Sequence, residues 1–147
     1  MKTLLIAILL IISTTAYSQD FKTVTYGSAG VNIDAEYNLT QVQGTAELNE
    51  QMKIGGTSFS LVALSLFKAD VPLFLGGAEV AQEVWNKDNK SLSLTGRYLY
   101  GTAGEQYIGL GMNYGISQVV SAKVNGDWDY KGKTALVTMG IGYTIIY

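Results

Sequence analysis

Apolar and polar residues alternate with a period of two along most of this chain, most clearly in the last fifteen residues. From Lys133 to Tyr147 the alternate positions form two sets, which we call the two parities of the strand. One parity carries Ala135, Val137, Met139, Ile141, Tyr143, Ile145 and Tyr147, and the other carries mostly small or polar residues. Successive side chains of a β-strand point to opposite faces, so this pattern predicts a strand with one broad apolar face. Such a strand is an aggregation hazard in water, whereas a strand that faces lipid needs this apolar face.

Seven earlier segments are also expected to be strands, at residues 29–39, 42–54, 58–67, 73–85, 91–101, 106–117 and 119–130. Turn residues such as Gly55-Gly56 separate them, and a change of parity between the first two indicates a hairpin. Two alternatives stay open. Residues 45–53 can also form a helical turn or two, and residues 58–67 are apolar on both parities, as a buried helix is. The preferred fold is all-β, an antiparallel up-and-down transmembrane β-barrel of eight strands.

The N-terminus has the pattern of a secretory signal peptide. Lys2 precedes an apolar run at residues 4–12, and Ala16-Tyr17-Ser18 forms a small-x-small cleavage site. Cleavage after Ser18 removes residues 1–18 of the 147 and leaves a barrel domain of 129, residues 19–147. Eight spans of about 9–11 residues need roughly 72–88 residues, which this length supplies. An even strand count puts both chain termini on the periplasmic side.

Charged residues indicate which face of each strand meets lipid. Nearly all of them lie on the parity opposite the apolar one: Asp34, Glu36, Glu47, Lys53, Glu79, Glu83, Arg97, Lys123, Asp127 and Asp129. An Arg or Lys facing lipid at mid-bilayer costs roughly 2–4 kcal/mol, so the charged parity is expected to face the lumen. Aromatic rings on the apolar parity fit the girdles that lie at both membrane interfaces.

The lumen of an eight-stranded barrel is narrow enough for side chains to fill it. We therefore expect polar side chains to fill this lumen, and Arg97 and Lys123 to pair there with carboxylates. The predicted partners are Glu36, Glu79, Glu83 and Asp127. An unpaired charge in this position is costly.

The composition of the chain argues against several classes of function. The chain has neither histidine nor cysteine, which removes the usual catalytic triads and zinc ligands. Carboxylate pairs such as Asp127/Asp129 and Glu79/Glu83 are spaced for acid–base hydrolysis, but any lumen-facing pair has the same spacing. Without the signal peptide the net charge is −3, with no basic stripe for nucleic acid. The sequence predicts no enzyme, no metal and no cofactor.

Part of the chain resembles a known family. Gly96-Arg97-Tyr98-Leu99-Tyr100, Tyr107-Ile108-Gly109-Leu110-Gly111 and Tyr114-Gly115-Ile116-Ser117 are similar to the C-terminal strands of YaiO-type outer-membrane β-barrels, and the short chain equally resembles small OmpX/OmpA-like barrels. The ending resembles the outer-membrane assembly signal, with Ile141, Tyr143, Ile145 and Tyr147 as the signal positions. This resemblance implies delivery by periplasmic chaperones and insertion by the barrel-assembly machinery.

The sequence therefore predicts an integral outer-membrane barrel of Gram-negative type with a structural or surface-interaction role. Its partners are outer-membrane lipid and the assembly machinery. One alternative is a secreted soluble β-barrel that binds an apolar ligand, with the apolar faces inward and the charges outward. Another alternative is a small pore, which requires open space in the lumen.

Overall fold

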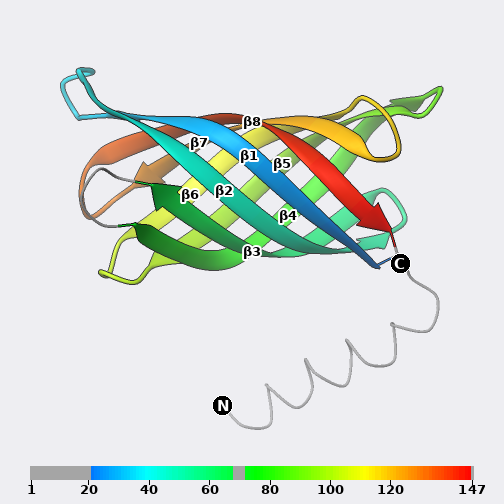
Figure 1. The fold of residues 1–147 in the computed structure, drawn as a ribbon, viewed down its shortest axis with the longest axis horizontal. Helices are drawn as coiled ribbons and strands as arrows, with labels where there is room; N and C mark the ends of the chain where they lie inside the picture. The colour runs from blue at the N-terminus through cyan, green and yellow to red at the C-terminus, as the bar shows by residue number, and fades with distance from the viewer. Residues whose placement is uncertain (1–20, 68–71, 147) are drawn as a thin grey trace, which may run out of the picture.

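The computed structural model describes residues 21–67 and 72–146 and shows one closed barrel of eight strands. The strands are β1 (Phe21–Ile33), β2 (Leu39–Ile54), β3 (Thr57–Phe67), β4 (Leu73–Lys87), β5 (Lys90–Gly101), β6 (Gln106–Gly115), β7 (Val120–Asp129) and β8 (Thr134–Ile146). Each strand pairs antiparallel with the next, and β8 pairs with β1 to close the sheet (Figure 1). The predicted eight-stranded up-and-down barrel is confirmed.

The described residues include no helix long and apolar enough to cross a membrane.

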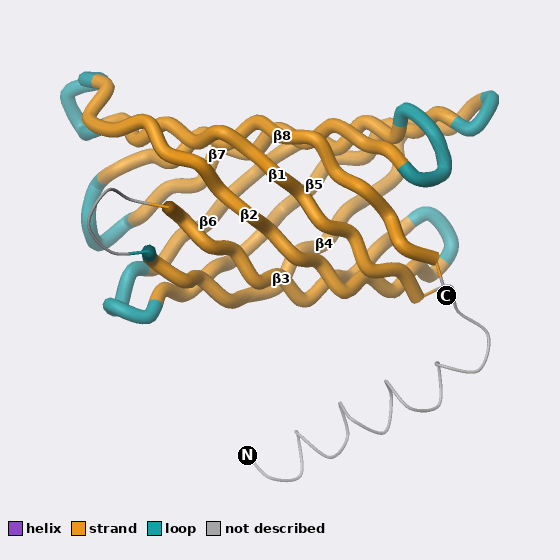
Figure 2. The backbone as a smooth tube through the Cα atoms, viewed as in Figure 1, coloured by secondary structure: helices purple, strands orange, loops and turns teal. Residues whose placement is uncertain are grey.

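The barrel has two distinct ends, which are seen at the right and left of Figure 2. At the termini end, β1 begins, β8 ends, and short turns join β2 to β3, β4 to β5 and β6 to β7. At the loop end lie the β1–β2, β5–β6 and β7–β8 connections, and β3 ends and β4 begins there. The β1–β2 hairpin extends beyond the loop end and the β4–β5 hairpin beyond the termini end. Closure leaves no continuous free edge along the barrel wall, which removes the aggregation hazard of an exposed strand.

The first predicted strand, at residues 29–39, is wrong at both ends, since β1 begins at Phe21 and ends at Ile33. The Asp34 carboxylate stops the strand because it accepts hydrogen bonds from the backbone N–H groups of Asn38 and Glu36, both at 2.9 Å. The bond from the Asn38 N–H lowers the pKa of the Asp34 carboxyl. Tyr37 completes the turn with a left-handed φ of 64°. Apolar and polar residues keep alternating through this turn, so the pattern alone did not reveal it.

The two segments with open alternatives are both strands. Residues 45–53 lie within β2 and residues 58–67 within β3, and the two pair in register from Gly44 opposite Phe67 to Ile54 opposite Thr57. β3 is apolar on both parities because one face points outward and the other contributes to an apolar cluster inside the barrel.

The orientation of the strands follows the predicted parity. Ile108 and Ile141 lie on the outer surface with 58% and 66% of their area exposed, whereas Arg97 and Lys123 lie inside at 4% and 3%. The outer surface between the ends carries aliphatic residues such as Leu110. Aromatic residues lie nearer the two ends: Phe59, Trp85, Tyr114 and Tyr143 toward the termini end, and Phe67, Phe74, Tyr100, Trp128 and Tyr130 toward the loop end.

Candidate functional site

Five charged side chains meet in the middle of the lumen, and we call them the charge cluster: Glu47, Glu79, Arg97, Lys123 and Asp127. Arg97 on β5 donates from Nε to Asp127 Oδ1 at 2.7 Å, from Nη2 to Asp127 Oδ2, and from Nη1 to Glu47 Oε2 at 2.8 Å. Lys123 Nζ on β7 donates to Glu47 Oε1 and Glu79 Oε2, both at 2.6 Å. Glu47 on β2 therefore bridges the two cations, and all five residues are buried.

Glycines on the neighbouring strands make room for this cluster. Gly109 on β6 lies between Arg97 on β5 and Asp127 on β7 in the strand register. A Cβ at Gly109 would overlap the Asp127 carboxylate, and one at Gly140, which pairs with Lys123, would overlap Ser28 and the backbone. Because Gly109 and Gly140 have no side chain, the long side chains of Arg97 and Lys123 can cross the narrow lumen.

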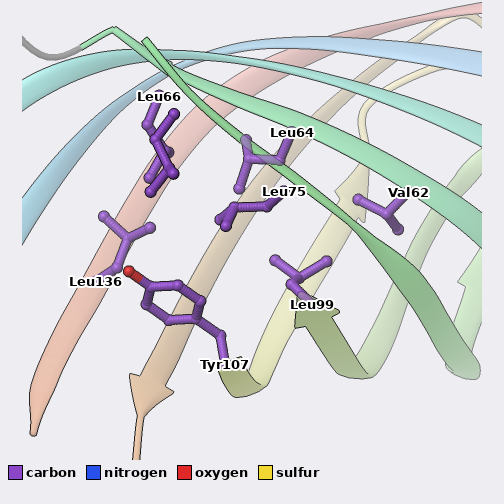
Figure 3. Close-up of a cluster of buried hydrophobic side chains, with 8 residues drawn as sticks. Val62, Leu64, Leu66, Leu75, Leu99, Tyr107 and Leu136 are labelled. Atoms are coloured by element: carbon purple, nitrogen blue, oxygen red, sulfur yellow. The ribbon is translucent and has the colours of Figure 1, made fainter. Parts of the chain in front are cut away.

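An apolar cluster occupies the lumen toward the loop end. It consists of Val62, Leu64, Leu66, Leu73, Leu75, Leu99, Tyr107 and Leu136, and the labelled side chains point toward one another inside the barrel (Figure 3). The prediction that polar side chains fill the lumen is wrong for this part of the barrel. The inward parity of β3 and the start of β4 carry leucine here, while Gln43 and Thr45 on β2 are buried polar residues at the same end of the lumen.

The termini end of the lumen opens into a polar cavity of about 250 Å³, which we call the vestibule. It is lined by Lys22, Val24, Tyr26, Gln51, Lys53, Ser58, Ala81, Glu83, Asn86, Asn89, Ser91, Ser93, Asn113, Gly115, Ser117, Gln118, Ser121 and Thr144. Lys53 and Glu83 form an ion pair across its wall at 3.0 Å.

Tyr26 forms the floor between the vestibule and the charge cluster. Its hydroxyl accepts a hydrogen bond from Asn113 Nδ2 at 3.1 Å and lies 3.5 Å from Ser121 Oγ. Lys123 Nζ lies 4.9 Å from the centre of the Tyr26 ring, within the range of a cation–π contact. The lumen thus has three successive zones: the vestibule, the charge cluster and the apolar cluster.

The structure brings together four of the six residues predicted to form the lumen network. Arg97, Lys123, Glu79 and Asp127 meet in the charge cluster. Glu83 lies apart in the vestibule with Lys53. The inclusion of Glu36 is wrong, because it lies exposed in the turn after β1.

Glu47 is the member of the cluster that the predicted list of partners omitted. Its place on the charged parity of β2 was visible in the sequence, but the alternation could not show which inward carboxylate faces Arg97 across the barrel. That relationship depends on the tilt and register of strands that are distant in sequence.

The candidate catalytic carboxylates have other partners. In the Glu79/Glu83 pair, Glu79 binds Lys123 and Glu83 binds Lys53. In the other pair, Asp127 binds Arg97, while Asp129 accepts a hydrogen bond from the Lys131 backbone N–H at 3.0 Å. Within residues 21–67 and 72–146, no group of three or more acidic side chains is placed to hold a metal ion.

The proposed assembly-signal residues lie on the last strand. Ile141, Tyr143 and Ile145 all point outward from β8 and are exposed. Tyr147 lies outside the described residues, as does the predicted signal peptide at residues 1–18.

Three comparisons relate this geometry to known proteins. No protein-family model matches the sequence, and no curated protein matches it. Among solved structures, the barrel is similar to Neisserial surface protein A, with a TM-score of 0.68 and 11% identity over 86% of this chain and 97% of that one. It is also similar to a de novo designed transmembrane β-barrel, with a TM-score of 0.57 and 13% identity over 84% and 95% of the two chains.

A third similar structure is the Yersinia pestis outer membrane protein Ail in a phospholipid bilayer nanodisc, with a TM-score of 0.50 and 9% identity over 86% and 99% of the two chains. Identities this low show the fold alone. The chain has the fold of the small eight-stranded β-barrels found among outer-membrane proteins.

Proposed function

We propose that this chain is an integral outer-membrane protein of Gram-negative type, without enzymatic activity, whose barrel has a structural or surface-interaction role. The observation that carries the proposal is the outer surface of the barrel. Aliphatic residues are exposed on the outer surface of β2 to β8, whereas β1 exposes Thr25, Gly27 and Ala29 there; aromatic residues lie toward both ends of this surface, and the buried charges lie inside. Lipid-facing belts with aromatic girdles are typical of barrels that span a bilayer.

The same surface argues against a soluble barrel that binds an apolar ligand. That alternative requires apolar faces inside and charges outside. Here Leu110 and Met139 are exposed at 75% and 66%, while Asp127 and Lys123 are almost completely buried. In water such an exposed apolar surface would drive association, because large apolar patches are rarely tolerated on monomeric soluble proteins.

A closed lumen supports a structural role over a pore. The charge cluster crosses the middle of the barrel through five hydrogen bonds, and the apolar cluster lies beyond it toward the loop end. An ion passing through would have to break buried ion pairs and then enter an aliphatic region, and both steps are costly.

The β1–β2 hairpin is the feature that favours surface interaction. It extends past the other strands at the loop end and exposes Tyr37, Leu39 and Val42. An even strand number requires both chain termini to lie on the periplasmic side, so this hairpin, at the opposite end of the barrel, points away from the cell. An exposed tyrosine held in a left-handed turn beside two aliphatic side chains is a suitable contact for a partner outside.

We further infer that the cleaved N-terminal signal directs export and that periplasmic chaperones and the barrel-assembly machinery recognise the outward residues of β8. The relation to YaiO-type barrels rests on the residue resemblance between Gly96 and Ser117, so it remains part of this proposal.

Membrane fractionation tests the proposed function. The full chain, expressed in a Gram-negative host, is expected in the outer-membrane fraction, and to migrate faster on a gel unboiled than boiled. Planar bilayers with the purified protein are expected to show no discrete conductance steps. Recovery as a freely soluble periplasmic protein would contradict the membrane assignment, and regular conductance steps would contradict the closed lumen.

A further inference from the structure

The vestibule is lined almost entirely by side chains that donate and accept hydrogen bonds. Five serines and five carboxamides surround it, and every one of the eight strands contributes at least one lining residue. Hydroxyl and carboxamide groups each offer both donors and acceptors. A ring of such groups around one cavity suits a solute with several hydroxyl groups, because each hydroxyl finds a partner in more than one orientation.

The charges of the vestibule favour an anion. Its three charged side chains are Lys22, Lys53 and Glu83, which sum to one positive charge. Glu83 forms an ion pair with Lys53 at 3.0 Å and also interacts electrostatically with Lys22, which leaves one of the three charges uncompensated. Among the described residues, no carboxylate lies within ion-pairing distance of Lys22. Lys22 is therefore the ammonium that can accept a negatively charged group from solution, and a hydrogen bond between two charged groups is about twice as strong as a neutral one.

The size of the cavity limits the ligand. At about 250 Å³ the vestibule is smaller than the pockets of roughly 300–1,000 Å³ that hold drug-sized ligands. Tyr26, fixed by Asn113, closes its inner end, so a solute enters from the termini end and stops there. The cavity is suited to a molecule the size of a single sugar or amino acid.

We propose that the vestibule binds a small, hydroxyl-rich solute with one negative charge, of the chemical class of the sugar acids. Its carboxylate lies on Lys22 and its hydroxyl groups on the surrounding serines and carboxamides. This site does not depend on the membrane assignment, since its residues face the lumen whichever solvent surrounds the barrel.

The test compares three probes on the full chain in detergent micelles by NMR: sodium glucuronate, glucose and sodium acetate. Glucuronate is expected to shift the amide signals of vestibule residues saturably. Glucose lacks the carboxylate and acetate lacks the hydroxyl groups, so each is expected to bind at least about tenfold more weakly.

Two variants then test whether the Lys22 ammonium binds the carboxylate of glucuronate. Lys22→Met is expected to lower glucuronate affinity at least about tenfold and leave glucose binding unchanged. Lys131→Met removes an exposed lysine at the loop end and is expected to change neither. Shifts that grow linearly with glucuronate in the unaltered protein, or equal binding of glucuronate and glucose, would overturn the proposal without use of a variant. An equal effect of the two lysine substitutions would overturn the role of Lys22.

Failure of this proposal and failure of the proposed function are distinguishable. If the protein is soluble and binds glucuronate, the vestibule proposal stands and the membrane assignment is contradicted. If it is an outer-membrane barrel that binds none of the probes, the membrane assignment stands and the vestibule proposal is contradicted.

Discussion

Arg97 and Asp127 lie on β5 and β7, 30 residues apart in sequence, and are joined by two parallel hydrogen bonds that pass over Gly109 of the strand between them. The pair has no exposed side-chain surface. A fork of two bonds between a guanidinium and a carboxylate fixes both side chains in one geometry. Glu47 occupies the remaining arm of the guanidinium, so this pair and the Lys123 contacts form one network.

Replacement of Arg97 with leucine tests the contribution of this network to stability. The change leaves Asp127 buried without its cation and Glu47 with only Lys123, and removal of one partner of a buried ion pair costs about 3–5 kcal/mol. We expect a clearly lower urea midpoint for unfolding in lipid vesicles. Lys90→Gln, at the exposed first residue of β5, is the control and should leave the midpoint unchanged. Equal midpoints for the two variants would mean that the network does not stabilise the barrel.

The two glutamates of the cluster should differ in their sensitivity to neutralisation. The cluster holds three carboxylates and two cations, so complete ionisation leaves one excess negative charge. Glu79 binds Lys123 alone, whereas Glu47 binds both cations. Glu79→Gln is therefore expected to change the free energy of unfolding by less than about 1 kcal/mol, and Glu47→Gln to destabilise by about 3 kcal/mol or more. The same vesicle unfolding experiment measures both, and the opposite order would show that the excess charge lies elsewhere.

Two glycines on adjacent strands provide a matched test of packing. A Cβ at Gly109 would overlap the Asp127 carboxylate and lie 3.1 Å from Arg97 Cγ, whereas a Cβ at Gly126 meets no atom within 4 Å. Gly109→Ala is expected to destabilise by about 1–3 kcal/mol, the usual cost of overpacking. Gly126→Ala should be close to neutral. Comparable losses in the two variants would contradict the inward placement of Gly109.

The apolar cluster makes a similar prediction at the loop end. Leu99 is completely buried in that cluster, while Leu110 lies on the outer surface with 75% of its area exposed. Leu99→Ala removes buried methyl groups and should cost about 2–5 kcal/mol. Leu110→Ala is expected to cost much less in vesicles, since lipid chains adapt to a smaller side chain. Equal unfolding midpoints for the two alanine variants would show that the cluster is not a packed core.

Much of this architecture could be predicted from the alternation of residues, because each lipid-facing strand must be apolar on one parity and avoid charge there. That constraint indicated the strand count and the inward direction of Arg97 and Lys123. The prediction from the alternation failed where both faces of a strand are apolar, or where both faces mix apolar and polar residues. Val24 and Tyr26 point inward on β1, so the first half of that strand did not show the expected pattern.

The partners of each inward charge were harder to predict than its direction. Glu36 and Glu47 both lie on a charged parity, yet one is in a turn and the other in the centre of the lumen. A hydrogen-bonding turn at Asp34 and the tilt of β2 decide between them. Contacts across a barrel depend on shear and register, which the local pattern does not contain.

The central claim is that the apolar parity faces hydrocarbon, and quenching of tryptophan fluorescence by brominated lipid measures this most directly. With Trp85 and Trp128 replaced by phenylalanine, one tryptophan is introduced by Leu110→Trp on the outer surface or by Tyr107→Trp inside the lumen. The barrel refolded in vesicles with dibrominated acyl chains is expected to show strong quenching at Leu110→Trp and weak quenching at Tyr107→Trp. Equal quenching at the two positions, or stronger quenching from the lumen position, would contradict the account.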